Sequence, residues 1–184
     1  MLFSQFQAVG QELFLRGLVS SHSGNLSIRL GDRLHITKRG CMLGSLREQD
    51  VIETGLSRND RTTPRASSEL KVHRTIYNLT PALAVVHAHS PHAVALSLTE
   101  KEVVPSDTEG TSLLPRVPVL GWRRKVLPGE MAEEIAQALL SHRIVLVHGH
   151  GTFAVGQLLE EAYQVTSALE ESCQILCILK SIAR

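Results

Sequence analysis

Two short apolar runs in this sequence each end in a pair of histidines separated by one residue. Ala84–Val86 leads directly into His87-Ala88-His89, and Ile144–Val147 leads into His148-Gly149-His150. Apolar runs of this length without polar alternation are typical of strands that are buried on both faces of a sheet. We therefore expect two interior strands of an α/β protein, and their unbroken apolar character favours parallel pairing. Open sheets usually bind their ligands at such strand ends.

The remaining pattern predicts helices and further strands around these two runs. Apolar residues at helical spacing predict helices near 6–14, 69–77, 132–139 and 158–176, and another helix begins at Ser90-Pro91. Alternation across 26–30 and 34–36 predicts a β-hairpin with Gly31-Asp32 as its turn, and residues 51–52 and 153–155 predict two more strands. The stretch from the Ser90-Pro91 helix to Gly129 reads as irregular.

Composition narrows the classes of protein to which the chain can belong. With 184 residues, 43% of them hydrophobic, the length favours one domain spanning 1–184. A formal charge of +1 lacks the broad basic surface that nucleic-acid binding requires. We find no signal-peptide pattern, no segment of membrane-spanning length and only three cysteines, so we expect a cytoplasmic protein that does not bind membranes.

The spacing of the histidine pairs suits a metal ion. On an extended strand His87 and His89 point to the same face about 6–7 Å apart, so both imidazoles can bind one ion. A third imidazole from His148 or His150 completes a site that suits zinc, or another divalent metal, and keeps one position open for substrate. We expect one ion per chain. The alternative, buried histidines bonded to carbonyls, explains poorly why such pairs occur at two strand ends.

Glu69 is the best candidate for an acid/base group. It lies in the first turn of a predicted helix, and the apolar strand that carries the first histidine pair follows this helix. A carboxylate beside a metal can remove the proton next to a carbonyl group. The spacing is equally compatible with an ordinary carboxylate that the helix dipole stabilises.

Small polar residues and glycines accompany Glu69. Ser67 and Ser68 precede the helix, where free backbone amides attract anions and where one serine is expected to cap the helix. Gly24-Asn25 and Gly40 supply flexible backbone that can approach a phosphate closely. Each of these residues, taken alone, is more often part of a turn or a cap.

Five short motifs follow one another along the chain: Ser23-Gly24-Asn25-Leu26-Ser27, Ile36-Thr37-Lys38-Arg39-Gly40, Ser67-Ser68-Glu69, Val86-His87-Ala88-His89-Ser90, and His150-Gly151 with Gly156. Together they resemble the class II aldolase/adducin family, and its aldolases that cleave L-fuculose 1-phosphate are the most similar members. The resemblance implies a three-layer α/β/α fold with a central, mainly antiparallel sheet, in place of the parallel strands that the apolar runs favour. It also implies a homotetramer with active sites at subunit interfaces.

The resemblance also implies roles for particular residues. His87, His89 and His150 match the zinc ligands, and Glu69 matches the carboxylate that serves as acid and base. The residues that match the phosphate-binding group are Gly24, Asn25, Gly40, Ser67 and Ser68, and Arg39 stands where the fuculose enzymes have threonine. The tyrosine that those enzymes contribute from a neighbouring subunit has no counterpart. Glu109 lies nearest its place and is the second catalytic candidate, with a solvated loop carboxylate as the alternative.

The implied function is that of a zinc-dependent lyase of carbohydrate metabolism. It would cleave a small ketose 1-phosphate, such as L-fuculose 1-phosphate, into dihydroxyacetone phosphate and an aldehyde. Glu69 argues against the related epimerases, which carry aspartate there, and against the dehydratases, which lack that carboxylate and use a glutamate in the region of Glu109. Decarboxylation stays open. A non-catalytic, adducin-like interaction module is the alternative of another class, and the retained histidines and Glu69 oppose it.

Overall fold

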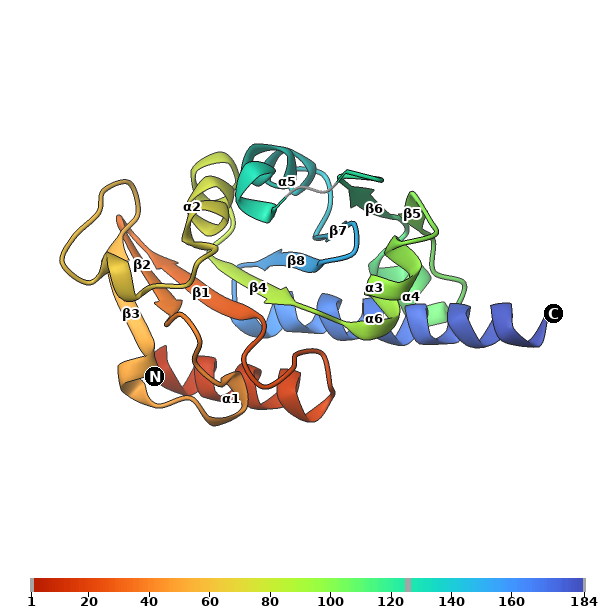
Figure 1. The fold of residues 1–184 in the computed structure, drawn as a ribbon, viewed down its shortest axis with the longest axis horizontal. Coiled ribbons are helices and arrows are strands. Elements are labelled where there is room, and N and C mark those ends of the chain that lie inside the picture. Colours follow the sequence, from red (N-terminus) through yellow and green to blue (C-terminus); the bar gives the residue numbers. More distant parts are fainter. Residues whose placement is uncertain (1, 125–126, 184) are drawn as a thin grey trace.

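A computed structural model describes residues 2–124 and 127–183, and an eight-stranded sheet runs through its centre (Figure 1). The strands lie in the order β3-β2-β1-β4-β8-β7-β6-β5. They are β1 (Asn25–Leu30), β2 (Arg33–Thr37), β3 (Val51–Gly55), β4 (Ala84–Ala88), β5 (Glu102–Val103), β6 (Val117–Leu120), β7 (Ile144–Val147) and β8 (Gly151–Gly156).

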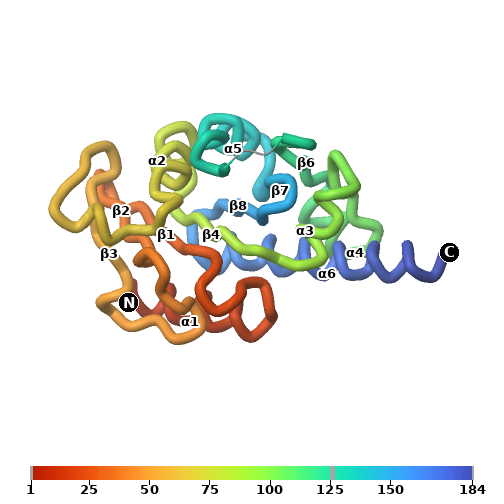
Figure 2. The backbone as a smooth tube through the Cα atoms, viewed as in Figure 1, coloured from red at the N-terminus to blue at the C-terminus, as the bar shows by residue number. Residues whose placement is uncertain are grey.

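Helices cover both faces of this sheet (Figures 1 and 2). They are α1 (Leu2–Leu15), α2 (Leu70–Leu79), α3 (Pro91–Ser97), α4 (Thr108–Leu113), α5 (Ala132–Ala138) and α6 (Leu159–Ile182). The pair α2 and α5 packs on one face, and α1, α3 and α6 pack on the other. This arrangement confirms the expected three-layer α/β/α fold.

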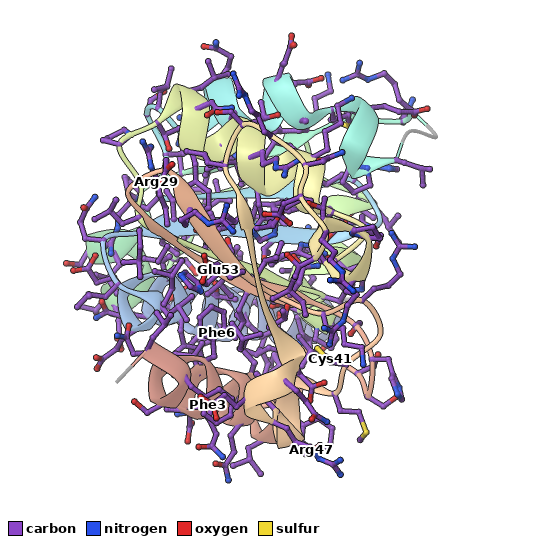
Figure 3. The ribbon with its side chains drawn as sticks, turned by 90° about the vertical axis from the view of Figure 1, so that its left-hand side faces the viewer. Phe3, Phe6, Arg29, Cys41, Arg47 and Glu53 are labelled. Atoms are coloured by element: carbon purple, nitrogen blue, oxygen red, sulfur yellow. The ribbon has the colours of Figure 1, made fainter. Side chains whose placement is uncertain are left out.

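The side chains of β4 explain why its sequence shows no polar alternation. All five of its residues are buried. Val86 belongs to the core beneath α1 and α6, whereas Val85 belongs to the core beneath α2 and α5. Figure 3 views the molecule from its β3 edge, where Phe6 of α1 lies between its helix and the sheet. Because each face of the strand meets a helix layer, every position has to be apolar or internally hydrogen-bonded.

The parallel pairing that the apolar runs favoured is wrong for β4, and it occurs on only one side of β7. β4 is antiparallel to its neighbours β1 and β8, and β7 is antiparallel to β8. Within the described residues only β6 and β7 pair in parallel. An unbroken apolar run reports that a strand is covered on both faces, and the helix layers cover these strands whatever their direction.

Most of the other local predictions are confirmed. The hairpin of β1 and β2 turns at Gly31, whose φ of +61° is readily adopted by glycine, and α2 and α6 extend beyond the predicted ends. The expected serine cap of α2 is wrong, because Glu69 occupies its N-cap, whereas Ser90 occupies the N-cap of α3 but makes no capping bond with its side chain. The stretch before Gly129 holds β5, α4 and β6, which are too short to produce a periodic pattern.

The long helix α6 closes the fold. It runs along the face of the sheet opposite α2 and α5, and its C-terminal end extends past the other elements (Figure 1). Among the described residues, none of the helices combines the length and apolar character needed to cross a membrane.

Candidate metal centre

Three strand ends meet at one place because β4 lies antiparallel between β1 and β8. The last residues of β4 therefore lie beside the first residues of its two neighbours, and His87 is opposite Asn25 on β1 and Phe153 on β8. His89 directly follows β4, and His150 directly precedes β8 in the tight turn from β7. The sheet topology thus brings His150 next to His87 and His89, which are more than sixty residues away in sequence.

His87, His89 and His150 form the cluster. Each offers one ring nitrogen, and these three atoms lie within 4.8 Å of one another. Nε2 of His87 and Nε2 of His89 are 2.9 Å apart. The spacing also left His148 open as the third member of the cluster. Its ring instead packs edge-on against Trp122, with 5.2 Å between the two ring centroids.

The surroundings of His87 determine which of its ring nitrogens carries the proton. Nδ1 lies 2.8 Å from the carbonyl oxygen of Thr152, and a carbonyl only accepts, so Nδ1 donates. Burial lowers the pKa of His87 to about 3, so the imidazole is neutral near pH 7. Its Nε2 therefore presents a lone pair to the cluster, which is the arrangement usual for a metal-binding histidine.

Glu69 approaches the cluster from the N-cap of α2. Its Oε2 accepts a hydrogen bond from Asn25 Nδ2 at 2.7 Å and lies 3.1 Å from His87 Nε2, while its Oε1 lies 3.1 Å from His150 Nε2. Burial acts to raise the pKa of Glu69, but the charge of His87 and the hydrogen bonds from His150 and Asn25 outweigh it. The pKa of this carboxyl therefore lies well below its usual range. Because burial keeps His87 neutral, the hydrogen bonds are the contribution that persists near pH 7.

The donor set fits a divalent cation. Neutral His87 directs a lone pair at a second imidazole nitrogen and at a carboxylate oxygen, and both of those atoms are electron-rich. Such a group of atoms is stable only with a proton or a metal cation among them. Three imidazole nitrogens are ligands that zinc accepts in catalytic sites.

A cavity of about 180 Å³ lies at this cluster. It is lined by ten of the residues singled out from the sequence, namely Gly24, Asn25, Arg39, Gly40, Ser67, Ser68, Glu69, His87, His89 and His150. His22, Ser23 and Lys38 line it as well, and the sequence reasoning did not assign them a role. All three lie within two residues of a glycine of the motifs, Gly24 or Gly40, and that position was the signal that could have identified them.

The non-histidine wall of the cavity is formed by two loops that lie against each other. The backbone N–H of Ser67 donates to the carbonyl of Thr37 at 3.1 Å, and Lys38 forms a β-bridge with Ala66. The Ser67 hydroxyl accepts from the Glu69 N–H at 3.2 Å and so keeps its own hydrogen for another acceptor. This wall offers hydroxyls, the start of α2 and the exposed side chain of Arg39, which are groups that bind anions.

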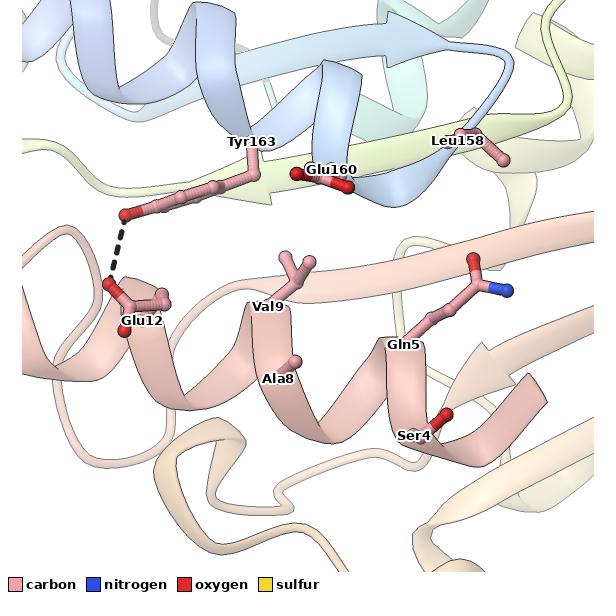
Figure 4. Close-up of a pocket in the computed structure, with 8 residues that line it drawn as sticks. All are labelled: Ser4, Gln5, Ala8, Val9, Glu12, Leu158, Glu160 and Tyr163. Carbon is pink, nitrogen blue, oxygen red and sulfur yellow. Dashed lines mark hydrogen bonds between the residues drawn. The ribbon is translucent and has the colours of Figure 1, made fainter. Parts of the chain in front are cut away.

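Glu109 lies apart from this cavity within one chain. It is exposed on α4 and lines a different surface depression, beside Arg16 and Glu171. Another depression of about 590 Å³ lies between α1 and α6, where Tyr163 donates to Glu12 at 3.3 Å (Figure 4). None of the residues that line this groove is a histidine, so we do not assign the chemistry to it.

Comparison with known proteins gives one consistent family. Residues 4–177 match the family described as "Class II Aldolase and Adducin N-terminal domain". The crystal structure of L-fuculose-1-phosphate aldolase from Thermus thermophilus superposes with a TM-score of 0.89 at 39% identity, covering 99% of this chain and 95% of that one. The L-fuculose phosphate aldolase of Methanococcus maripaludis strain C7 is 30% identical over 92% of this chain and 93% of its own length. The methylthioribulose-1-phosphate dehydratase of Acidiphilium cryptum strain JF-5 is 34% identical over 89% and 83%.

Proposed function

Because the chain belongs to the class II aldolase and adducin family, we propose that it is a metal-dependent aldolase of sugar-phosphate metabolism. Its substrate is a small ketose 1-phosphate such as L-fuculose 1-phosphate, which it cleaves into dihydroxyacetone phosphate and an aldehyde. One observation carries this proposal: three imidazoles, a carboxylate and an anion-binding wall surround one cavity of about 180 Å³. The protein works as a cytoplasmic homotetramer.

His87, His89 and His150 are the residues that would hold one divalent ion per chain, zinc by preference. When bound, this ion supplies a Lewis acid for the carbonyl and hydroxyl oxygens of the ketose. His87 is prepared for this role, because Thr152 fixes the proton on Nδ1 and leaves Nε2 free to bind.

Glu69 handles the proton at carbon 3 of the ketose. In the cleavage direction the bond between carbons 3 and 4 breaks, and its electron pair stays with carbon 3. Glu69, a carboxylate at rest, takes a proton from water and passes it to carbon 3, while the proton that leaves the carbon 4 hydroxyl returns to water. In the synthetic direction the carboxylate removes the proton from carbon 3. The hydrogen bond from Asn25 holds the carboxylate in place and favours the anion that the synthetic direction needs.

The phosphate occupies the wall opposite the histidines. Gly24, Gly40 and the start of α2 offer backbone amides, and the remaining groups are Asn25, Arg39, Ser67 and Ser68. Binding the phosphate there orients the ketone relative to Glu69, so that proton transfer becomes an intramolecular step. The proton on the hydroxyl at carbon 4 leaves through Glu109 of a neighbouring subunit.

Deuterium exchange into dihydroxyacetone phosphate tests the function. We expect the metal-loaded protein to exchange the proton next to the carbonyl, and we expect exchange to stop after chelation and to return with zinc. Glu69→Gln should keep its metal yet lose about a hundredfold or more of the exchange rate, because an amide cannot accept the proton. Glu48→Gln, at an exposed carboxylate of the same charge, is the matched control. A fully loaded wild-type protein that exchanges nothing would favour the adducin-like module instead.

Dehydration is the second candidate, because the Acidiphilium relative at 34% identity is a dehydratase. The carboxylate of Glu69 at the cluster opposes it. An assay with several ketose 1-phosphates separates the two reactions. Retro-aldol cleavage releases dihydroxyacetone phosphate, whereas dehydration removes water and leaves the carbon chain unbroken. Loss of substrate without dihydroxyacetone phosphate would overturn the aldolase assignment.

A further inference from the structure

Behind Glu69 a continuous row of hydrogen bonds leads from the cavity into the core. Asn25 joins Glu69 at 2.7 Å and His73 at 2.5 Å. His73 Nδ1 lies 2.6 Å from the Ser27 hydroxyl, which in turn lies 2.7 Å from the Tyr77 hydroxyl. His73, Ser27 and Tyr77 are at most 1% exposed, and none of them lines the cavity.

The spacing of these residues explains how the row is built. Asn25 and Ser27 are two apart on β1, so they point to the same face of the sheet. Glu69, His73 and Tyr77 are spaced by four, so they follow one face of α2 from its N-cap inward. The helix and the strand thus place alternating partners against each other.

Only one arrangement of hydrogens satisfies every member of the row. A Glu69 carboxylate can only accept, so Asn25 turns its NH₂ group toward Glu69 and its carbonyl toward His73. His73 Nε2 must then donate, and its Nδ1 must accept from the Ser27 hydroxyl. The single Tyr77 hydrogen then faces two acceptors of Ser27, the hydroxyl oxygen at 2.7 Å and the backbone carbonyl at 2.9 Å, and it completes the row. Burial lowers the pKa of His73 to about 4 and raises that of Tyr77, so both are neutral in this arrangement.

We infer that His73 is a positioning residue for proton transfer, because its Nε2–H holds the Asn25 amide in the orientation that donates to Glu69. The inference rests on the proposed role of Glu69 as the proton carrier. Without a donor at Nε2, the amide is free to rotate by half a turn and place its carbonyl oxygen against the carboxylate. Two oxygens with lone pairs repel each other, and Glu69 would leave the position from which it reaches the substrate carbon.

Two substitutions of equal polarity separate this role from simple packing. His73→Gln (H73Q) places an amide where Nε2 of the imidazole lies, so this variant can still donate to Asn25. His73→Asn (H73N) places its amide near Nδ1, where it reaches Ser27 and leaves Asn25 without a donor. We expect H73Q to keep exchange into dihydroxyacetone phosphate within about threefold of wild type and H73N to lose about tenfold or more. Metal content should stay near wild type in both, because His73 contacts none of the three histidines of the cluster through a hydrogen bond.

Nitrogen-15 NMR of the wild-type protein tests the same inference without any variant. The His73 imidazole should be neutral, with its proton on Nε2 and with Nδ1 unprotonated. A proton on Nδ1 would overturn the inference, as would an H73N protein that exchanges at the wild-type rate. A metal-loaded wild type that exchanges no proton contradicts the proposed function, whereas equal rates in wild type and H73N contradict only the positioning role.

Discussion

Asn25 serves two neighbours at once, since its amide donates to Glu69 and accepts from His73. The resemblance to the aldolases suggested this asparagine only for its phosphate contact. In the structure one Nδ2 hydrogen is committed to Glu69, so the second one remains for a phosphate oxygen. A single residue can therefore couple the orientation of the substrate to the position of the carboxylate.

His73 predicts a pH dependence of stability in the metal-free protein. Burial lowers its pKa from 6.5 in the unfolded chain to about 4 in the fold. A lowered histidine pKa means that the unfolded state binds the proton first, so its contribution to stability is complete above pH 6.5 and declines toward pH 4. As the pH falls from 6.5 to 4, we expect protonation linked to His73 to lower the free energy of unfolding by about 1.4 kcal/mol for each pH unit.

Urea unfolding of chelated wild type and H73Q between pH 7 and pH 4 measures this effect. The variant has no titrating group at this position, so its stability should fall less steeply. Burial also lowers the pKa of His87, so His87 makes the stability of both proteins fall with pH in the same way. Its contribution therefore cancels when the two slopes are compared. Identical slopes for the two proteins would show that His73 is not a buried neutral imidazole.

At the scale of elements, the site depends on how closely the start of β1 approaches β4. Gly24 has a φ of +77°, and a Cβ built on it would lie 2.6 Å from Val19 Cγ1 and 2.8 Å from the carbonyl oxygen of His87. A side chain there is strained by its backbone and also pushes against the strand that carries His87.

Gly24→Ala should therefore destabilise the fold and weaken metal binding together. Gly31→Ala is the matched control, because Gly31 has a φ of +61° but nothing lies within 4 Å of its added Cβ. We expect the control to lose about 1–2 kcal/mol from backbone strain alone and to keep its metal. Chemical denaturation and zinc titration check both quantities. Equal losses of stability and unchanged zinc affinity in the two variants would mean that the close approach to β4 has no consequence.

At the scale of the whole molecule, one chain leaves parts of its surface that an oligomer would cover. Ile178, Leu179 and Ile182 are between 49% and 72% exposed near the end of α6, which extends past the other elements (Figure 1). Exposed apolar side chains in such a group are typical of contacts between subunits. They support the proposed homotetramer, in which Glu109 of one chain reaches the cavity of another.

Mixed oligomers test whether the active site is shared. Glu69→Gln and Glu109→Gln should each be nearly inactive in cleavage, and Glu109→Gln should still exchange the proton of dihydroxyacetone phosphate, because that step needs Glu69 alone. If the two residues come from different chains, unfolding and refolding the variants together at equal amounts should restore about a quarter of the sites. Each variant refolded alone is the control. A mixture as inactive as its components would refute a site shared across the interface.

Particular residues show why the candidate site could be predicted in part. Sequence spacing and order were enough to identify the two histidine pairs, Glu69 and the Gly24-Asn25 motif as candidates. The choice of His150 over His148 came from the family resemblance, and the cluster geometry agrees with it. His73 escaped notice, although its spacing of four from Glu69 placed both on one face of the predicted helix. A spacing alone does not say which strand faces that helix.

The sequence by itself determined the burial of the central strands, the main helices and the family to which the chain belongs, because these depend on local periodicity and on short ordered motifs. Only the tertiary structure decided which strands are neighbours in the order β1-β4-β8, the hydrogen-bonded row behind Glu69 and the placement of Glu109 away from the cavity of its own chain. The physical reason is that an apolar run reports whether a strand is covered and not which strand lies beside it. Pairing between segments far apart in sequence is decided by how the helix layers pack on the sheet.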